Sequence, residues 1–327
     1  MYDLYLKELR LINYCSYDDY KINFCKPDGT PYRYVCFFGP NGIGKSTLLE
    51  AISLLTVNNH GRTDKCVKES LFKFVRNKNY DPLWSRLDPG MKLENMMIQG
   101  TFVMNGREYI VQLTQDGFVR NDLAPIAPPD ADEEDIPRIQ NGGPFGKLHL
   151  LFRQRISHFF KTDSDLSMSK FQLHISQAEN FEKIISQIMR YKADCISPSG
   201  LTAEERQYCT DFVIHKRGHQ IHYKRMSAGE RKICKSFSSL LNMMYDLANP
   251  EPGEIAMPGW PRLLLIDNVE MHVYYDRHVQ LVESLKEVFR NQQIFATTHS
   301  GVLVQRYLKG ENDQKNELYI DLEPING

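Results

Sequence analysis

The chain has 327 residues and a formal net charge of −1, because 40 Lys and Arg residues oppose 41 Asp and Glu residues. Hydrophobic residues make up 42% and charged residues 25%, which is ordinary for a globular protein and excludes a collagen-like, wholly disordered or membrane-channel chain. This length predicts one large domain or two small ones, without a generally basic coat for nucleic acid.

Targeting and redox features favour a cytoplasmic protein. No apolar run approaches the roughly 18 residues that a membrane span needs, and the N-terminus lacks the apolar core of a signal peptide. The seven cysteines are odd in number, scattered along the chain and form no CxxC pair. We therefore expect reduced thiols, no disulfides and no membrane association.

The first 52 residues predict three strands and a helix. Apolar residues alternate with polar ones at Leu9–Leu11 and Tyr20–Phe24, which is the period of a half-buried strand. The short apolar run Tyr34–Phe38 is typical of a fully buried strand. A glycine-rich loop follows this run, and residues 46–52 then read as a helix.

Residues 96–120 predict an antiparallel meander, because Asn105-Gly106 and Asp116-Gly117 are strong hairpin turns between alternating segments. Residues 121–143 are rich in Pro, Asp and Glu and almost free of large apolar residues. We interpret them as an exposed, mobile acidic loop, and a regulatory role for its charge is the alternative that we considered.

The second half of the chain alternates between helices and strands. Apolar spacing predicts helices within 147–194, after Met226 and around Val282–Phe289. It also predicts a strand pair over 212–223 and buried strands at 262–266 and 293–297. The sequence therefore predicts an α/β fold: a mixed sheet with flanking helices, joined to the antiparallel meander.

The expected domain organisation is an N-terminal lobe over 1–146, a short helical insertion over 147–211 and a C-terminal lobe over 212–327. The two lobes together would form the core.

The strongest functional motif runs from the predicted strand Tyr34–Phe38 into the following helix. It matches G-x-x-x-x-G-K-[ST] in the context that a phosphate-binding loop requires. Its residues, which we expect to bind nucleotide, are Gly39, Pro40, Asn41, Gly42, Ile43, Gly44, Lys45, Ser46 and Thr47. Glycines let backbone N–H groups wrap the phosphates, while Lys45 should reach the β- and γ-phosphates and Ser46 should hold Mg²⁺. The predicted cofactors are ATP and Mg²⁺.

Three further motifs follow in order. The first, Met226-Ser227-Ala228-Gly229-Glu230-Arg231, is a helix capping box by spacing. The second is the apolar strand that ends at Asp267, and the third is Thr298-His299-Ser300 after the last predicted strand.

In this order and spacing, the four motifs resemble those of ATP-binding-cassette ATPases of the SMC/RecF/OLD type. The opening Leu11-Ile12-Asn13-Tyr14-Cys15-Ser16-Tyr17 is similar to the start of that group, and Asp267-Asn268-Val269-Glu270-Met271-His272 is similar to its D-E-P-E-x-H run. The resemblance covers roughly residues 1–115 and 210–305.

The resemblance implies roles for residues outside the loop. Asn13 would contact nucleotide, and Asp267 would orient the water shell of Mg²⁺. Ser227, Gly229 and Glu230 would form the signature that contacts the γ-phosphate held by a second subunit, and His299 would be the switch histidine. Gln154 is our first candidate for the glutamine that contacts Mg²⁺ and Gln140 the second, while Asp276 is a candidate dimer contact.

One departure concerns the catalytic base. Asn268 stands where the family usually has the catalytic glutamate, directly after the aspartate. An amide cannot accept the proton of the attacking water, so we expect slow hydrolysis. Glu270 lies two residues on and is the alternative base, although we favour a structural role for it.

Other clusters carry weaker alternatives. His215, His219 and His222 have spacing that a metal site would accept, but we favour a solvated strand pair. A basic run of five residues either contacts phosphates of nucleic acid or is a solvated face; it comprises Lys65, Lys68, Lys73, Arg76 and Lys78.

The resemblance is closest to the small ATPases of prokaryotic anti-phage systems of the Septu and retron-associated kind, which act with a separate nuclease. Little of the sequence follows Gln305, so we expect this chain to lack the nuclease domain that OLD-type proteins carry after their ATPase cassette. We therefore expect a head-to-tail homodimer around ATP that regulates a partner nuclease, with DNA or RNA as its target. The alternatives are a DNA repair or recombination ATPase that clamps DNA itself and, in third place, a transporter subunit.

Overall fold

A computed structural model describes residues 4–55, 96–114, 117–122, 171–196, 207–249, 263–270, 273–311 and 316–322. The chain divides into two compact units, one of residues 1–32 and 41–152 and the other of residues 33–40 and 153–327. The strand Tyr34–Phe38 thus belongs to the second unit, together with the C-terminal half of the chain. The lobe and insertion boundaries expected at 146 and 211 stay predictions.

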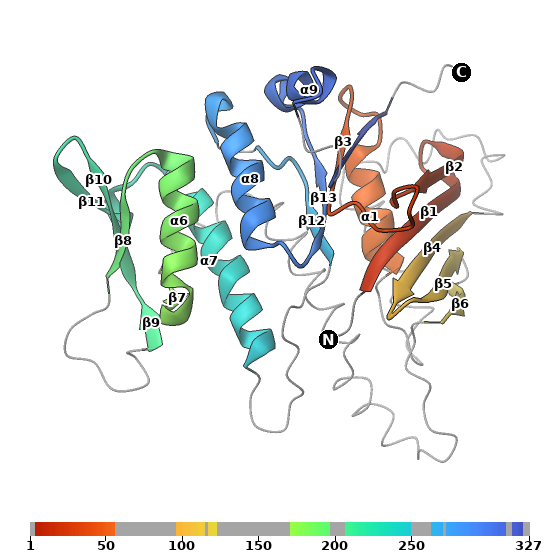
Figure 1. Cartoon of the computed structure of the whole chain (residues 1–327), viewed down its shortest axis with the longest axis horizontal. Helices are drawn as coiled ribbons and strands as arrows, with labels where there is room; N and C mark the ends of the chain where they lie inside the picture. The colour runs from red at the N-terminus through yellow and green to blue at the C-terminus, as the bar shows by residue number, and fades with distance from the viewer. Residues whose placement is uncertain are drawn as a thin grey trace, which may run out of the picture. The chain divides into compact units, whose positions relative to one another are not determined.

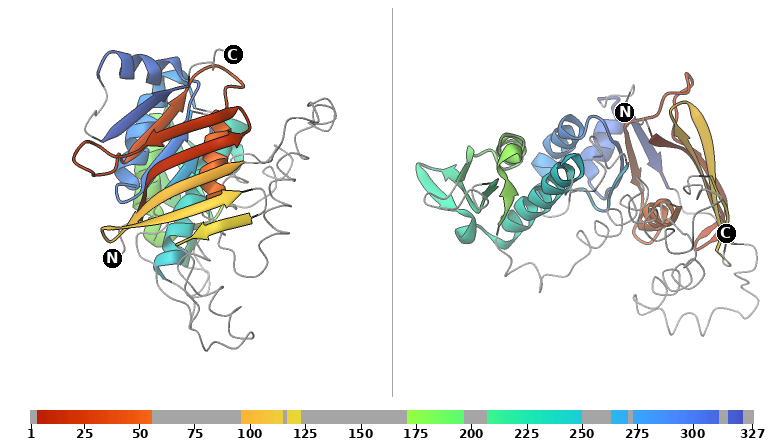
Figure 2. Two further views of the ribbon diagram at one scale, coloured as in Figure 1. Left: turned by 90° about the vertical axis from the view of Figure 1, so that its right-hand side faces the viewer. Right: turned by 90° about the horizontal axis from the view of Figure 1, so that it is seen from below.

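The first unit contains a five-stranded antiparallel sheet with the order β2-β1-β4-β5-β6 (Figure 2, left). The strands are β1 (Leu4–Tyr14), β2 (Tyr17–Asn23), β4 (Met97–Met104), β5 (Arg107–Thr114) and β6 (Gly117–Asn121). Asn105 and Gly106 form the β4–β5 turn with φ angles of 50° and 77°, as a tight hairpin requires. The antiparallel meander is confirmed, while Asp116 and residues 123–143 of the acidic loop lie outside the described residues.

Helix α1 (Lys45–Leu55) packs on strands β4 and β5 of this sheet. Leu48, Leu49 and Ile52 repeat at helical spacing and are at most 3% exposed, so one face of α1 is apolar. A Cβ on Gly100 would lie 2.7 Å from the Leu55 side chain. Glycine at this position therefore allows the end of the helix to approach the sheet closely.

The second unit is built on a four-stranded sheet with the order β12-β13-β3-β14, in which all described pairings are parallel (Figure 1). The strands are β3 (Tyr34–Phe38), β12 (Leu263–Ile266), β13 (Gln293–Thr297) and β14 (Glu317–Asp321). Every residue of β3, β12 and β13 is buried, which explains their continuous apolar runs. The predicted α/β fold class, with a core sheet, flanking helices and an antiparallel meander, is confirmed.

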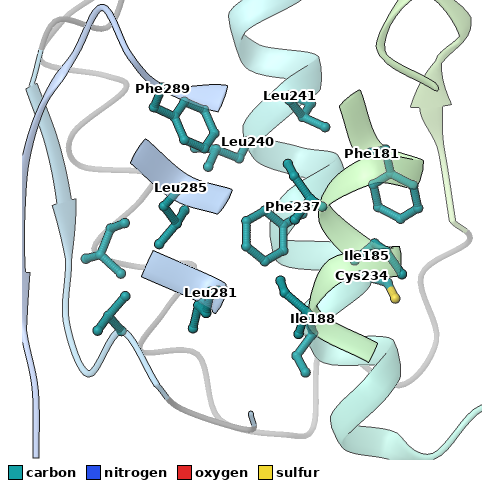
Figure 3. Packing of buried hydrophobic residues seen from close by; sticks show 14 of the residues in the cluster. Phe181, Ile185, Ile188, Cys234, Phe237, Leu240, Leu241, Leu281, Leu285 and Phe289 are labelled. Atoms are coloured by element: carbon teal, nitrogen blue, oxygen red, sulfur yellow. The ribbon is translucent and has the colours of Figure 1, made fainter. Parts of the chain in front are cut away.

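Three helices of the second unit share one apolar core (Figure 3). They are α6 (Ala178–Met189), α7 (Ala228–Ala248) and α8 (His278–Val288), and a shorter helix, α9 (Gly301–Leu308), follows β13. Phe181, Phe237 and Leu285 each come from a different one of the first three helices, and all are buried in this core. The helical faces expected in α6, α7 and α8 are therefore confirmed, whereas α9 and β14 were not predicted.

Two small sheets complete the described part of the second unit. One has the order β11-β10-β8, with β8 (Ala193–Ile196), β10 (Asp211–Lys216) and β11 (His219–His222). The other pairs β7 (Leu173–His174) with β9 (Tyr208–Cys209). Short 3₁₀ turns lie at η1 (Ile175–Gln177), η3 (Tyr223–Arg225) and η4 (Tyr275–Arg277).

Two histidines of the β10–β11 hairpin, His215 and His222, pair with carboxylates. His215 Nε2 lies 2.6 Å from Asp194 Oδ2, and His222 Nδ1 lies 2.9 Å from Asp211 Oδ2. Among the described residues no group of three or more His, Cys, Asp and Glu is arranged to hold a metal ion, and the cysteines there are free. Nor does any helix in the described segments have the length and apolarity to cross a membrane.

Candidate nucleotide-binding site

The phosphate loop connects the end of β3 at Phe38 with the start of α1 at Lys45. Its three glycines, Gly39, Gly42 and Gly44, have φ angles of 140°, 81° and 102°. Residues with a side chain rarely adopt a positive φ. The path of the backbone therefore requires glycine at these three positions. The predicted strand, loop and helix are thus confirmed in the arrangement that the motif requires.

Tyr17 lies in the β1–β2 hairpin and holds the end of this loop at Gly44, which belongs to the same unit. Its side chain is only 3% exposed, and its hydroxyl donates to the Gly44 carbonyl at 3.1 Å. Burial, together with the neighbouring Tyr20, raises the pKa of Tyr17, so the phenol keeps its proton and stays a donor. A Cβ on Gly44 would lie 2.8 Å from this hydroxyl, which leaves no room for a side chain. Sequence reasoning missed this contact.

The remaining residues of the loop lie at or just before the first turn of α1. Lys45 is the first residue of the helix and is 5% exposed, and Ser46 and Thr47 are half-buried. Pro40, Asn41 and Gly42 are exposed. A helix N-terminus presents backbone N–H groups and the positive end of the helix dipole, which together favour a phosphate group. Asn13, also predicted to contact nucleotide, is exposed near the end of β1 with φ 47°.

In the second unit, Asp267 directly follows strand β12 and is 6% exposed. It accepts a hydrogen bond from the hydroxyl of Thr297 at the end of β13, and the backbone N–H of Asn268 donates to the same hydroxyl at 2.8 Å. Asn268 has φ 52°, a left-handed conformation that asparagine tolerates well. Thr297 therefore fixes both the carboxylate and the turn that follows it.

Glu270 uses both carboxylate oxygens to hold the turn after β13. Thr298 Oγ1 donates to Glu270 Oε2 at 2.7 Å, and the backbone N–H of His299 donates to Glu270 Oε1 at 2.6 Å. Thr298 is fully buried, whereas the side chain of His299 is exposed. The carboxylate thus has a clear structural task, which favours our interpretation of Glu270 over its alternative role as a base.

The signature segment caps the 21-residue helix α7. The backbone N–H of Ser227 donates to Glu230 Oε2 at 2.8 Å, and the N–H of Glu230 donates to Ser227 Oγ at 3.3 Å. This is the capping box expected from the spacing. Ser227 is exposed, and a Cβ on Gly229 would meet nothing within 4 Å. Arg231 fixes the preceding turn by donating to the Met226 carbonyl at 2.7 Å.

The remaining predicted residues are Asp276 and several positions that the structure does not describe. Asp276 is exposed in η4, with an oxygen 3.7 Å from the guanidinium of Arg190. Gln154, Gln140 and the basic run between Lys65 and Lys78 lie outside the described residues, so their roles stay predictions.

Comparison with known proteins gives relatives for the whole arrangement. The family model described as an AAA domain matches residues 8–194. The Septu protein PtuA of Bacillus thuringiensis is 23% identical, over 92% of this chain and 73% of that protein. The Septu protein PtuA of Bacillus mycoides is 20% identical over 97% of this chain, which spans only 42% of that longer protein.

Solved structures similar to this chain include an SMC head domain from Thermotoga maritima, which is 18% identical with a TM-score of 0.47. The match covers 92% of this chain and 91% of the SMC head domain. An Smc head domain from Pyrococcus furiosus, with an extended coiled coil and bound to the C-terminal domain of ScpA, has 12% identity and a TM-score of 0.47, with the same coverage of both chains.

The resemblance to Septu ATPases predicted from the motifs is confirmed by these relatives. Because the family model matches more than half of the residues, this chain belongs to the AAA domain family of ATPases.

Proposed function

We propose that this ATPase binds Mg²⁺–ATP through its phosphate loop and hydrolyses it slowly. The observation that carries the proposal is the loop itself, with three glycines at positive φ and Lys45 as the first residue of α1. The α1 N-terminus supplies donors for an anionic phosphate, and Lys45 adds a positive charge. Together they fit a nucleoside triphosphate.

The metal would be held by Ser46, while Asp267 would orient its water shell. Bound Mg²⁺ supplies charge neutralisation on the β- and γ-phosphates. The donor set fits this ion, because hydroxyl and carboxylate oxygens are hard ligands that Mg²⁺ prefers. Asn268 would hydrogen-bond a water without taking its proton, which is the basis for slow turnover.

A head-to-tail homodimer would complete the site. Ser227 is exposed at the N-terminus of a long helix, and each chain carries both a phosphate loop and a signature segment. In the dimer, Ser227, Gly229 and Glu230 of one protomer would face the γ-phosphate held by Lys45 of its partner. C₂ symmetry would make this interface isologous.

The biological role that we propose is regulation of a separate nuclease in anti-phage defence, in the cytoplasm, with DNA or RNA as the nuclease target. Similarity to two Septu PtuA proteins over more than nine-tenths of this chain supports this proposal. Purification of the chain together with the products of its neighbouring genes tests it. Recovery of a nuclease in a stable complex is expected, whereas DNA binding by the isolated ATPase would favour the DNA-clamping alternative.

Isothermal titration calorimetry tests the nucleotide site. We expect Lys45→Ala to abolish detectable ATP binding, because a point charge on the β- and γ-phosphates is lost. Lys309→Ala, at the exposed C-terminus of α9, is the matched control and should bind like the wild type. Equal ATP affinity in the wild type and Lys45→Ala would refute the assignment of the loop.

A further inference from the structure

A closed ring of hydrogen bonds surrounds the turn that carries His299. On one side, Glu270 accepts from the Thr298 hydroxyl at 2.7 Å, and its backbone carbonyl accepts from the Val273 N–H at 3.0 Å. On the other side, the Ser300 N–H donates to Thr298 Oγ1 at 3.0 Å. His278 closes the ring between Val273 and Ser300, with distances of 2.9 Å to the Val273 carbonyl and 2.7 Å to Ser300 Oγ.

His278 is the link in this ring that sequence reasoning did not single out. It begins α8 and is 7% exposed, while Ser300 is 5% exposed. A carbonyl only accepts, so Nε2 must carry the proton that is donated to Val273. In the neutral ring, Nδ1 then accepts from the Ser300 hydroxyl. The same Ser300 oxygen accepts from the Leu303 N–H at 3.3 Å, which caps α9.

The ring fixes the backbone of His299 while its side chain stays exposed. The His299 N–H donates to Glu270 Oε1 at 2.6 Å, so the residue is held between two members of the ring, Thr298 and Ser300. Removing one link leaves buried polar atoms unpaired and allows the turn to open. The position of His299 thus depends on a residue 21 positions earlier in the chain.

We propose that His278 is a positioning residue for His299 and that it acts on ATP hydrolysis only through the 298–300 turn. This inference rests on the proposed function and on the role that the resemblance gives His299, that of the switch histidine that senses the γ-phosphate. His278 itself would touch neither nucleotide nor metal. It joins the segment that follows Asp267 to the turn that follows β13, so that both keep one arrangement.

Two substitutions of His278 distinguish the effect of its hydrogen bonds from the effect of its packing. The amide of glutamine offers both N–H donors and a carbonyl acceptor, so it can supply the two kinds of hydrogen bond that the neutral imidazole makes, whereas leucine can supply neither. We expect His278→Leu to lower the kcat for ATP hydrolysis about tenfold, the size expected for leaving buried groups unpaired. ATP affinity by calorimetry should stay at the wild-type value, and His278→Gln should recover most of the rate.

A double-mutant cycle tests whether the effect passes through His299. If it does, His278→Leu should cause no further loss of kcat in a His299→Ala background, because the residue being positioned is already gone. Equal losses in both backgrounds would overturn the proposal. Val282→Ala, which opens a cavity one turn further along α8, is the control for general destabilisation and should leave kcat unchanged.

Amide hydrogen exchange of the nucleotide-free chain provides a readout that does not depend on ATP. Exchange at residues 299–300 should be faster in His278→Leu than in the wild type, and His278→Gln should restore protection. If His278→Leu does not fold, Ser300→Ala breaks the same link from the other side. Unchanged exchange would overturn the ring as a positioning device, whereas faster exchange without ATP binding by the wild type would refute only the proposed function.

Discussion

Replacing Asn268 with glutamate should accelerate ATP hydrolysis. Asn268 follows the buried Asp267, at the position where the resemblance places a general base. Its amide can orient a water molecule but cannot remove a proton. The substitution Asn268→Glu would supply the missing carboxylate at this position, on a turn that Thr297 already holds through the Asn268 N–H at 2.8 Å.

The expected gain exceeds the structural cost. A positioned base contributes about 10²- to 10⁴-fold to a rate, which corresponds to a barrier lower by about 2.7–5.4 kcal/mol. Asn268 has φ 52°, and a residue other than Gly, Asn or Asp pays about 1–2 kcal/mol in this left-handed conformation. That cost lowers the free energy of unfolding but does not cancel the gain in rate.

Steady-state phosphate release measures the effect, with Asn268→Gln as the matched control. Glutamine has the length of glutamate and pays the same backbone strain, but it cannot accept the proton. We expect Asn268→Glu to hydrolyse ATP at least about a hundredfold faster than both Asn268→Gln and the wild type. A longer-lived ATP-bound dimer in the wild type than in Asn268→Glu, measured by light scattering, is the second expected result.

Glu270→Gln distinguishes the competing interpretation. Because both oxygens of Glu270 hold the turn after β13, we expect this variant to change the rate by less than about tenfold, since an amide retains one of the two acceptors. If Glu270→Gln stopped turnover while Asn268→Glu and Asn268→Gln were equally slow, Glu270 would be the base and our reasoning would be wrong.

Three further predictions concern stability and assembly. Gly44→Ala should lower the thermal unfolding midpoint more than Gly29→Ala, because both pay for a positive φ but only Gly44 faces Tyr17, at 2.8 Å; equal shifts would contradict the close contact. Ser227→Ala should lower the free energy of unfolding by about 0.5–2 kcal/mol, because the helix cap is lost. The same variant should weaken ATP-dependent dimerisation, measured by analytical ultracentrifugation. Dimerisation at wild-type strength would count against Ser227 as an interface residue. Phe181→Ala should cost about 3–5 kcal/mol in denaturant unfolding, since the ring is fully buried; a loss below 1 kcal/mol would show that α6 does not belong to the core.

The sequence was sufficient for features that depend on local pattern. Continuous apolar runs identified β3, β12 and β13, because strands buried on both faces have no polar alternation. The glycines of the phosphate loop were recognisable because few residues other than glycine adopt positive φ readily. In each case the residues that determine the structure lie within about ten positions of one another.

Features that depend on distant contacts escaped prediction. Tyr17 reaches Gly44 across 27 positions, and Thr297 reaches Asp267 across 30, so neither contact leaves a local pattern. Strand β14 has only five residues, too few for alternation to stand out. Helix α9 did leave a signal that was overlooked: Ser300 precedes an apolar run and caps the helix by accepting from the Leu303 N–H.

The closed ring around His299 also constrains how the protein can evolve. Each member offers a polar atom that another member needs, and leaving one such buried atom unpaired costs about 1–3 kcal/mol, a large share of the 5–15 kcal/mol by which domains are usually stable. Loss of His278 alone is therefore a costly intermediate, and so is loss of Ser300 alone. Related sequences should therefore either keep both residues or have replaced both. The two positions should co-vary among them even though they lie 22 residues apart in the chain.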